Sequence, residues 1–389
     1  MARGRATDAS SSLEALLTAN EVVVTCGSGG VGKTTSAAAL GAMAASRLGG
    51  RVLVLTVDPA KRLANALGLE QFGNVESEVP RSAFTVAGVQ PRGQLFAAML
   101  DTKASWDDLV RLHAPDAATR DAILANPLYQ NITGKFVQSH DYIAMERLYE
   151  IHSSGRYDLI IVDTPPTRNA IDFLEAPDRM AEFFGSRLLR WLTAPARSRV
   201  LNYASKPFYS IADRILGSQF LEDIGEFFLL FQTMYEGFVE RSHAVARLLE
   251  DHGTTFVVVS TLEPAPAQEA EYFVNALTER KLHLGALVFN KVLPTELFSP
   301  EAAKVADRLD RDAAPVAQAV ADRVPDTEQA ARVLNEVAES FLNYRLVASR
   351  EAEEAARLGA RAEVVATVPY LADDIHDLAG LLSIGAHLW

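Results

Sequence analysis

One stretch near the N-terminus, Gly27–Thr34, constrains the fold more than any other part of the chain. It reads GSGGVGKT and fits the pattern G-x-x-x-x-G-K-[ST], in which a glycine-rich loop joins a strand to a helix. The apolar run Val22–Cys26 precedes it, and an alanine-rich helical pattern, Thr35–Leu48, follows it. Glycines let the backbone approach an anion closely, and successive N–H groups at a helix N-terminus attract negative charge. The loop is therefore predicted to bind phosphates.

The loop residues have distinct expected roles toward a nucleoside triphosphate. Lys33 is expected to reach the β- and γ-phosphates, and the Thr34 hydroxyl to ligate Mg²⁺. The alternative is a glycine-rich turn that matches the pattern by chance. The predicted nucleotide-binding set is Gly27, Ser28, Gly29, Gly30, Val31, Gly32, Lys33, Thr34 and Thr35.

Seven short runs rich in β-branched residues are typical of buried parallel strands. Long helical patterns separate them, which favours an α/β fold with a doubly wound, mostly parallel sheet. We predict a tail at residues 1–20 and a single P-loop domain over 21–389. The runs are Val22–Cys26, Val52–Val57, Leu95–Leu100, Leu159–Val162, Phe256–Ser260, Leu287–Asn290 and Val364–Val368.

Three segments interrupt this alternation, and all three have helical patterns. They cover about residues 101–150, 178–250 and 300–360, and the first two are predicted helical insertions. The second holds eight of the chain's 18 phenylalanines. Its apolar stripe has two interpretations, a buried core face or a groove for a hydrophobic client. The stripe consists of Leu221, Ile224, Phe228, Phe231 and Tyr235.

Two aspartates follow predicted strands at the edge of the sheet where ligands bind. Asp163 ends the run YDLIIVD, where a carboxylate suits the shell of a Mg²⁺ ion; the alternative is a carboxylate that caps a turn. Asp58 ends VLVLTVD, where a carboxylate can orient or deprotonate an attacking water. Asp58 also precedes Pro59, and a helix N-cap explains it equally well.

Composition excludes several classes of protein. The formal net charge is −13, which disfavours nucleic-acid binding because that requires basic surface. Cys26 is the single cysteine, so neither an intrachain disulfide nor a cysteine-paired zinc site can form. No apolar run approaches the ~20 residues of a membrane-spanning helix. We expect a cytoplasmic protein that is not an integral membrane protein, with peripheral contact to the membrane left open.

Seven segments, taken in chain order, resemble the ArsA-type ATPase family of P-loop NTPases with a deviant Walker A loop. The family includes arsenite-pump motors and cytosolic ATPases that target tail-anchored membrane proteins. The resemblance covers almost the whole chain and is closest to an actinobacterial subgroup. The segments are GSGGVGKTT, TVDPAKRLANALG, MERLYE, IIVDTPPTRNAIDFLEAP, VVVSTLEPAPAQEAEYFVNAL, LVFNKV and VPYLADDIHDLAGL.

The resemblance implies an ATPase that uses ATP and Mg²⁺. It makes Asp58 the residue of switch I that activates water, and Asn290 the residue that recognises adenine. Pro369 and Tyr370 lie where the loop after the last strand packs on the base. Switch II, which senses the γ-phosphate, corresponds to Asp163, Thr164, Pro165, Pro166, Thr167 and Arg168.

The resemblance also implies a dimer that closes over two ATP molecules, with a helical subdomain that binds hydrophobic protein segments. This chain lacks the cysteines that bind arsenite or zinc in relatives, and Ser28 replaces a lysine that reaches the partner's phosphates. We therefore expect a homodimer or, slightly favoured, a heterodimer with a related subunit that keeps the lysine. The alternatives are a slow nucleotide-dependent regulator or scaffold, or the motor of an anion transporter.

Overall fold

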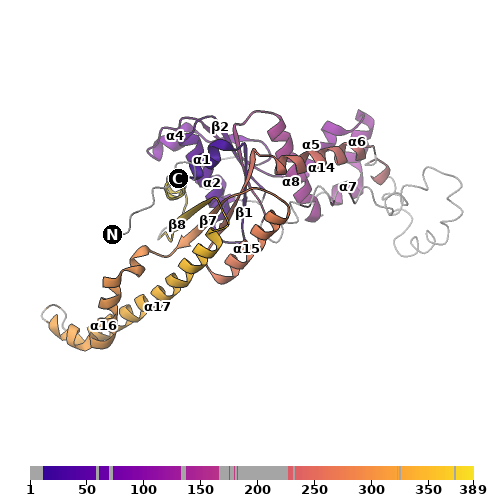
Figure 1. Ribbon diagram of the computed structural model, residues 1–389. Coiled ribbons are helices and arrows are strands. Elements are labelled where there is room, and N and C mark those ends of the chain that lie inside the picture. Colours follow the sequence, from indigo (N-terminus) through magenta and orange to yellow (C-terminus); the bar gives the residue numbers. More distant parts are fainter. Residues whose placement is uncertain are drawn as a thin grey trace.

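An eight-stranded sheet forms the centre of the protein (Figure 1). The computed structural model describes residues 12–57, 61–69, 73–132, 137–165, 175, 179, 182, 227–230, 233–321, 323, 326–371 and 374–389. The strand order is β3-β4-β2-β5-β1-β6-β7-β8, and every pair except β3–β4 is parallel. The strands are β1 (Val22–Cys26), β2 (Arg51–Thr56), β3 (Ser77–Glu78), β4 (Gln94–Met99), β5 (Leu159–Asp163), β6 (Thr254–Ser260), β7 (Leu284–Val292) and β8 (Val364–Pro369).

The predicted α/β class is confirmed, and each of the seven predicted runs contains or overlaps a strand. The prediction missed β3, which has two residues and pairs antiparallel with β4. Two residues are too few to show an alternating pattern, so the sequence carries no signal for this edge strand.

Helices cover both faces of the sheet, and each face buries its own apolar cluster. The first face carries α5 (Thr102–His113), α8 (Val137–Ser153), α14 (Tyr235–Glu250) and α15 (Pro264–Glu279). The opposite face carries α1 (Leu13–Ala19), α2 (Lys33–Arg47), α3 (Lys61–Ala66), α4 (Arg81–Val86) and α18 (Leu378–Leu388).

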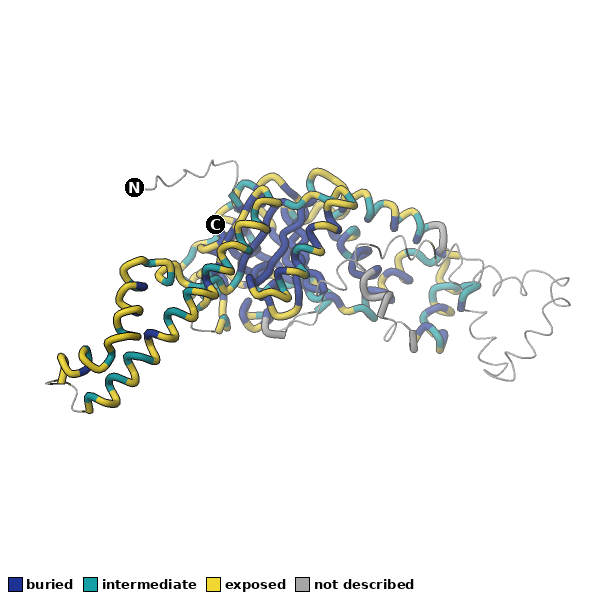
Figure 2. Tube along the Cα trace, turned by 60° about the horizontal axis from the view of Figure 1, so that its bottom comes forward, coloured by how far each residue is buried: buried dark blue, intermediate teal, exposed yellow. Residues whose placement is uncertain are grey.

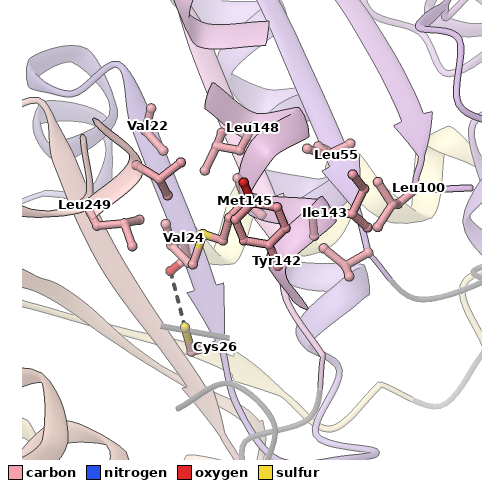
Figure 3. Close-up of a cluster of buried hydrophobic side chains, with 14 of the residues drawn as sticks. Val22, Val24, Cys26, Leu55, Leu100, Tyr142, Ile143, Met145, Leu148 and Leu249 are labelled. Carbon is pink, nitrogen blue, oxygen red and sulfur yellow. Dashed lines mark hydrogen bonds between the residues drawn. The ribbon is translucent and has the colours of Figure 1, made fainter. Parts of the chain in front are cut away.

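Strand β1 shows how one strand serves both clusters. Val22, Val24 and Cys26 belong to the first cluster, whereas Val23 belongs to the second, because side chains alternate across a sheet. Figure 3 shows the first cluster, where β1 faces Tyr142 and Met145 of α8. Burial on both faces explains why β1 is a continuous apolar run.

Helices gather at one end of the molecule beside the sheet (Figure 1). This group contains α5, α6 (Ala117–Ala125), α7 (Pro127–Ile132), α8 and α14. Helix α5 begins where the Asp101 side chain accepts a hydrogen bond from the Ala104 N–H, which is an N-cap.

A two-helix arm extends from the other end of the sheet (Figure 1). It begins at the 3₁₀ turn η1 (Thr295–Phe298) and consists of α16 (Pro300–Ala319) and α17 (Thr327–Gly359). Asp312 has non-helical dihedral angles three residues before Pro315, which cannot donate the hydrogen bond a helix needs. The sheet is the most buried part of the protein, and the arm is largely exposed (Figure 2).

Among the described residues, none of the helices combines the length and the apolarity needed to cross a bilayer.

Candidate active site

The phosphate loop lies between β1 and α2, as the motif requires. Gly32 is the residue before α2 and has a φ of 91°, and Gly30 has a φ of 82°; both are left-handed conformations that favour glycine. A Cβ on Gly27 would lie 2.2 Å from the Val259 carbonyl oxygen, so a side chain there would collide with β6. The glycines therefore set the path of the loop and keep its backbone open to an anion.

The carboxylate of Asp163 is the centre of the polar contacts below the loop. Thr34 Oγ1 donates to Asp163 Oδ2 at 2.6 Å, and Lys33 Nζ lies 3.0 Å from Asp163 Oδ1. Thr56 Oγ1 donates to Oδ2 at 3.0 Å. The Lys33 ammonium also donates to the Thr164 carbonyl oxygen. Asp163 is fully buried and Lys33 is 7% exposed, so the ion pair has little contact with water.

The register of the sheet explains this meeting of side chains. Asp163 is the partner of Thr25 on β1 and of Thr56 on β2, and all three lie near the carboxyl ends of parallel strands. Thr56 is not among the site residues predicted from the sequence. In the sequence, Thr56 is only a threonine at the end of the second strand, two residues before Asp58. Its place beside Asp163 follows from the order of the strands in the sheet.

The donor set fits Mg²⁺ and a phosphate group. Mg²⁺ prefers oxygen ligands such as hydroxyls and carboxylates. The Thr34 hydroxyl and the Asp163 carboxylate lie side by side. Ser28 is 9% exposed, and its buried hydroxyl has no hydrogen-bond partner among the described residues. An unpaired polar atom inside a glycine loop is consistent with a polar ligand at that position.

The predicted adenine residues lie at the same edge of the sheet as the loop. Asn290 Nδ2 donates to the Val31 carbonyl oxygen at 2.7 Å. The Tyr370 N–H donates to the Val292 carbonyl oxygen at 3.0 Å, and its side chain is 65% exposed. Pro369 is the β8 partner of Val292. The loop after β8 therefore lies beside the end of β7. Asn290, which was predicted to recognise adenine, forms a hydrogen bond with the phosphate loop in this structure.

Part of the predicted switch regions can be placed. Asp163 and Thr164 are buried, and Thr164 Oγ1 donates to the Thr25 carbonyl oxygen at 2.9 Å. Pro165 follows, and is also buried. The predictions for Asp58, Pro166, Thr167 and Arg168 lie outside the described residues.

Cys26 ends β1 directly before the loop and is almost completely buried, at 1% exposure. Its Sγ donates weakly to the Val24 carbonyl oxygen at 3.8 Å (Figure 3). Burial raises the pKa of the Cys26 thiol to about 12, so the thiol is neutral at physiological pH. Cys26 is a packing residue of the strand.

The predicted apolar stripe is only partly described. Leu221, Ile224 and Phe231 lie outside the described residues. Phe228 is partly buried and packs against the first apolar cluster, with its ring 5.2 Å from that of Phe227. Tyr235 is the first residue of α14. Phe228 therefore contacts the core, which favours the first of the two interpretations for this residue.

The fold and these contacts define a P-loop nucleotide-binding protein: a parallel sheet with a glycine loop after one strand and a buried aspartate at the end of its neighbour. Residues 20–325 match the anion-transporting ATPase family, ArsA. The match spans most of the chain, and the protein belongs to this family, as the sequence resemblance predicted.

Relatives from bacteria and eukaryotes share this similarity. An uncharacterized protein of Streptomyces coelicolor is 29% identical over 271 residues, which are 69% of this chain and 62% of that protein. An ATPase GET3 of Malassezia globosa is 25% identical over 282 residues, 69% of this chain and 71% of the relative. A putative arsenical pump-driving ATPase of Prosthecochloris vibrioformis is 27% identical over 196 residues, 49% of this chain and 42% of the relative. The chain thus spans less than two thirds of the first and third of these proteins.

Proposed function

We propose that the protein is a Mg²⁺-dependent ATPase of the ArsA type, which hydrolyses ATP to ADP and phosphate. The observation that carries this proposal is the contact of one buried carboxylate, Asp163, with both Lys33 and Thr34. The two loop residues that a nucleoside triphosphate requires are thereby positioned by the neighbouring strand. The names of the relatives, which include ATPases GET3 and ASNA1, support the same activity.

Each of these residues has a definite task in the proposed reaction. When a nucleotide binds, the Lys33 ammonium would give up its bonds to Asp163 and to the Thr164 carbonyl oxygen and donate to phosphate oxygens instead. Thr34 and Asp163 would hold Mg²⁺, the hydroxyl directly and the carboxylate through the ion's shell. When bound, the ion neutralises phosphate charge. Since Thr56 also bonds to Asp163, the carboxylate keeps its orientation when Lys33 leaves it.

The proposed general base is Asp58. Thr56 ends β2 beside Asp163, and Val57 continues the pairing through its N–H, which donates to the Asp163 carbonyl oxygen at 3.0 Å. Val57 therefore lies at the phosphate edge of the sheet, and Asp58, which is outside the described residues, follows it directly in the sequence. This supports a role in orienting the attacking water, rather than a helix cap alone.

The proposed assembly is a dimer, and Ser28 suggests its composition. The Ser28 hydroxyl carries no charge and is too short to reach another subunit. A symmetric pair would therefore lack a cation at both sites, and loss of such a cation in trans costs several orders of magnitude in rate. We propose a heterodimer in which a related subunit donates a lysine into this site. Arg168 is the residue that would replace that lysine within one chain.

A comparison of rates tests the assembly. The isolated chain is expected to bind ATP but to turn it over slowly, and the related subunit is expected to raise the rate only when it keeps its lysine. A purified chain that hydrolyses ATP as fast as the mixture, with no gain from Ser28→Lys, would exclude the heterodimer and make Arg168 the next residue to change.

The proposed purpose of the cycle is to open and close a helical client-binding subdomain. The phenylalanine-rich segment within residues 178–250 supports a hydrophobic protein client. Phe228→Asp tests this: a folded variant that hydrolyses ATP but loses its client supports the groove. Unfolding, which a buried unpaired charge would cause, assigns Phe228 to the core alone.

Slow turnover is also what a nucleotide-dependent regulator would show, and the uncharged Ser28 favours this second candidate. Calorimetric titration with ATP, with and without Mg²⁺, tests the shared basis of both. Binding that strengthens with Mg²⁺ supports the site described above, and no binding of ATP or ADP excludes both candidates. Turnover measured at saturating ATP, with the related subunit present, then distinguishes the ATPase from the regulator.

A further inference from the structure

Helix α17 exposes a row of mostly apolar side chains along the two-helix arm (Figure 2). The four large members of the row are between 44% and 57% exposed, and a serine lies exposed between them. Successive members are four, three, four and three residues apart, so all of them lie on one side of the helix. This arm stripe consists of Val333, Val337, Ser340, Tyr344 and Val347.

The other helix of the arm leaves the arm stripe uncovered. Helix α16 packs along α17, and the α17 residues that are buried within the arm are Ala338 and Ala348, beside the stripe. Single exposed apolar residues are ordinary on a protein surface, but a row of them at coiled-coil spacing is a surface on which another helix can pack. Among the described residues, α17 thus has one packing surface more than α16 uses.

The side chains of the arm stripe are complementary to those of a second, antiparallel copy. Once one contact between two such helices is chosen, the heptad spacing fixes the others. With Tyr344 opposite Ser340 of the second copy, Val337 lies opposite Val347, and twofold symmetry repeats both contacts. A large side chain then faces a small one, and valines face each other.

The charges beside the arm stripe agree with the same register. Glu336 and Arg350 are both exposed, and neither pairs with another described residue. In the antiparallel register, Glu336 of each copy lies opposite Arg350 of the other. In a parallel pair the two charges would stay about 21 Å apart along the arm, because 14 residues separate them. The opposite charges therefore favour the antiparallel direction.

We propose that a second copy of this chain docks antiparallel on the arm stripe, so that the two α17 helices pack against each other. Tyr344 is near the centre of the contact, and the pairs of Glu336 with Arg350 set its direction and register. The surface shares no residue with the phosphate site. This inference goes beyond the proposed ATPase activity, and it is separate from the proposed dimer around the nucleotide.

Charge reversal tests the register, read by sedimentation velocity of the full chain without nucleotide at low ionic strength. The wild type is expected to dimerise as its concentration rises. Glu336→Arg and Arg350→Glu each place like charges opposite each other, and each is expected to weaken association by about 10-fold or more. An equimolar mixture of the two variants should restore association, because every facing pair is then of opposite charge. Glu353→Arg, exposed on another side of α17, is the control and should dimerise as the wild type does.

A second variant tests the apolar part of the contact. Tyr344 is 57% exposed, so Tyr344→Asp should fold, and the unpaired carboxylate it places in the contact should weaken association by about 10-fold or more. Leu346→Asp is the matched control, at a position 54% exposed on α17 outside the arm stripe. A wild-type chain that stays monomeric would overturn the proposal. So would unchanged association in Tyr344→Asp, or charge variants whose mixture associates no better than each alone.

Discussion

The side-chain amide of Asn290 on β7 donates to the Val31 carbonyl oxygen of the phosphate loop at 2.7 Å. Its Oδ1 accepts from the Lys291 N–H at 2.9 Å, so both ends of the amide are engaged. The contact depends on Gly32, where a Cβ would lie 2.2 Å from Asn290 Nδ2. Asn290 therefore links β7 to the loop that is predicted to bind phosphate.

Asn290→Ala is predicted to weaken inorganic tripolyphosphate and ATP by the same factor, about 3- to 10-fold, the worth of one ordinary hydrogen bond. Tripolyphosphate has no base, so it reports loop positioning without adenine recognition. Both affinities can be measured by calorimetry, with Asn335→Ala on α17 as the control. If ATP weakens and tripolyphosphate does not, Asn290 acts on adenine and its bond to Val31 has no role in binding phosphate.

Thr34→Val is predicted to weaken ATP by about 10-fold or more in the presence of Mg²⁺, because the hydroxyl is the proposed metal ligand. In EDTA the same variant should bind ATP nearly as the wild type does. Thr85→Val on α4, an exposed threonine, is the matched control. An equal loss with and without Mg²⁺ would mean that Thr34 acts through the fold and not through the metal.

Asp58→Asn is predicted to keep ATP affinity and to lower kcat by about 10²-fold, the scale for loss of a general base. Steady-state phosphate release gives kcat, and calorimetry gives the affinity. Asp310→Asn, on the exposed side of α16, is the control. Unchanged hydrolysis in Asp58→Asn would leave Asp58 as a helix cap.

Cys26 is predicted to resist iodoacetamide in the native protein at pH 8 and to react once the chain is unfolded. The reason is its 1% exposure together with a thiol pKa of about 12. Because the folded pKa lies above the ordinary 9.0, this group's contribution to stability is complete below pH 9 and is lost as the pH rises toward 12. Rapid native alkylation, read by mass spectrometry, would contradict the buried position.

The strands and the loop were predictable because their signals are local. Val22–Cys26 is a continuous apolar run, and the glycines of Gly27–Thr34 follow it directly. A strand buried on both faces must be apolar throughout, so its position in the chain can be read without knowing its neighbours.

The contacts among side chains were less predictable, because they depend on strand order. Thr56 meets Asp163 only because β2 lies beside β5, although 107 residues separate the two in the chain. The engagement of Asn290 with Val31 spans 259 residues and likewise has no local signal.

The most direct test is Mg²⁺-dependent phosphate release by the purified chain at saturating ATP, compared between wild type and Lys33→Ala. We predict slow but measurable release by the wild type and its loss in Lys33→Ala, because the ammonium beside Asp163 is the cation proposed to bind the phosphates. Lys304→Ala, an exposed lysine on α16, should retain the wild-type rate. Near-wild-type kcat and KM in Lys33→Ala would contradict the assignment of this loop as the catalytic phosphate site.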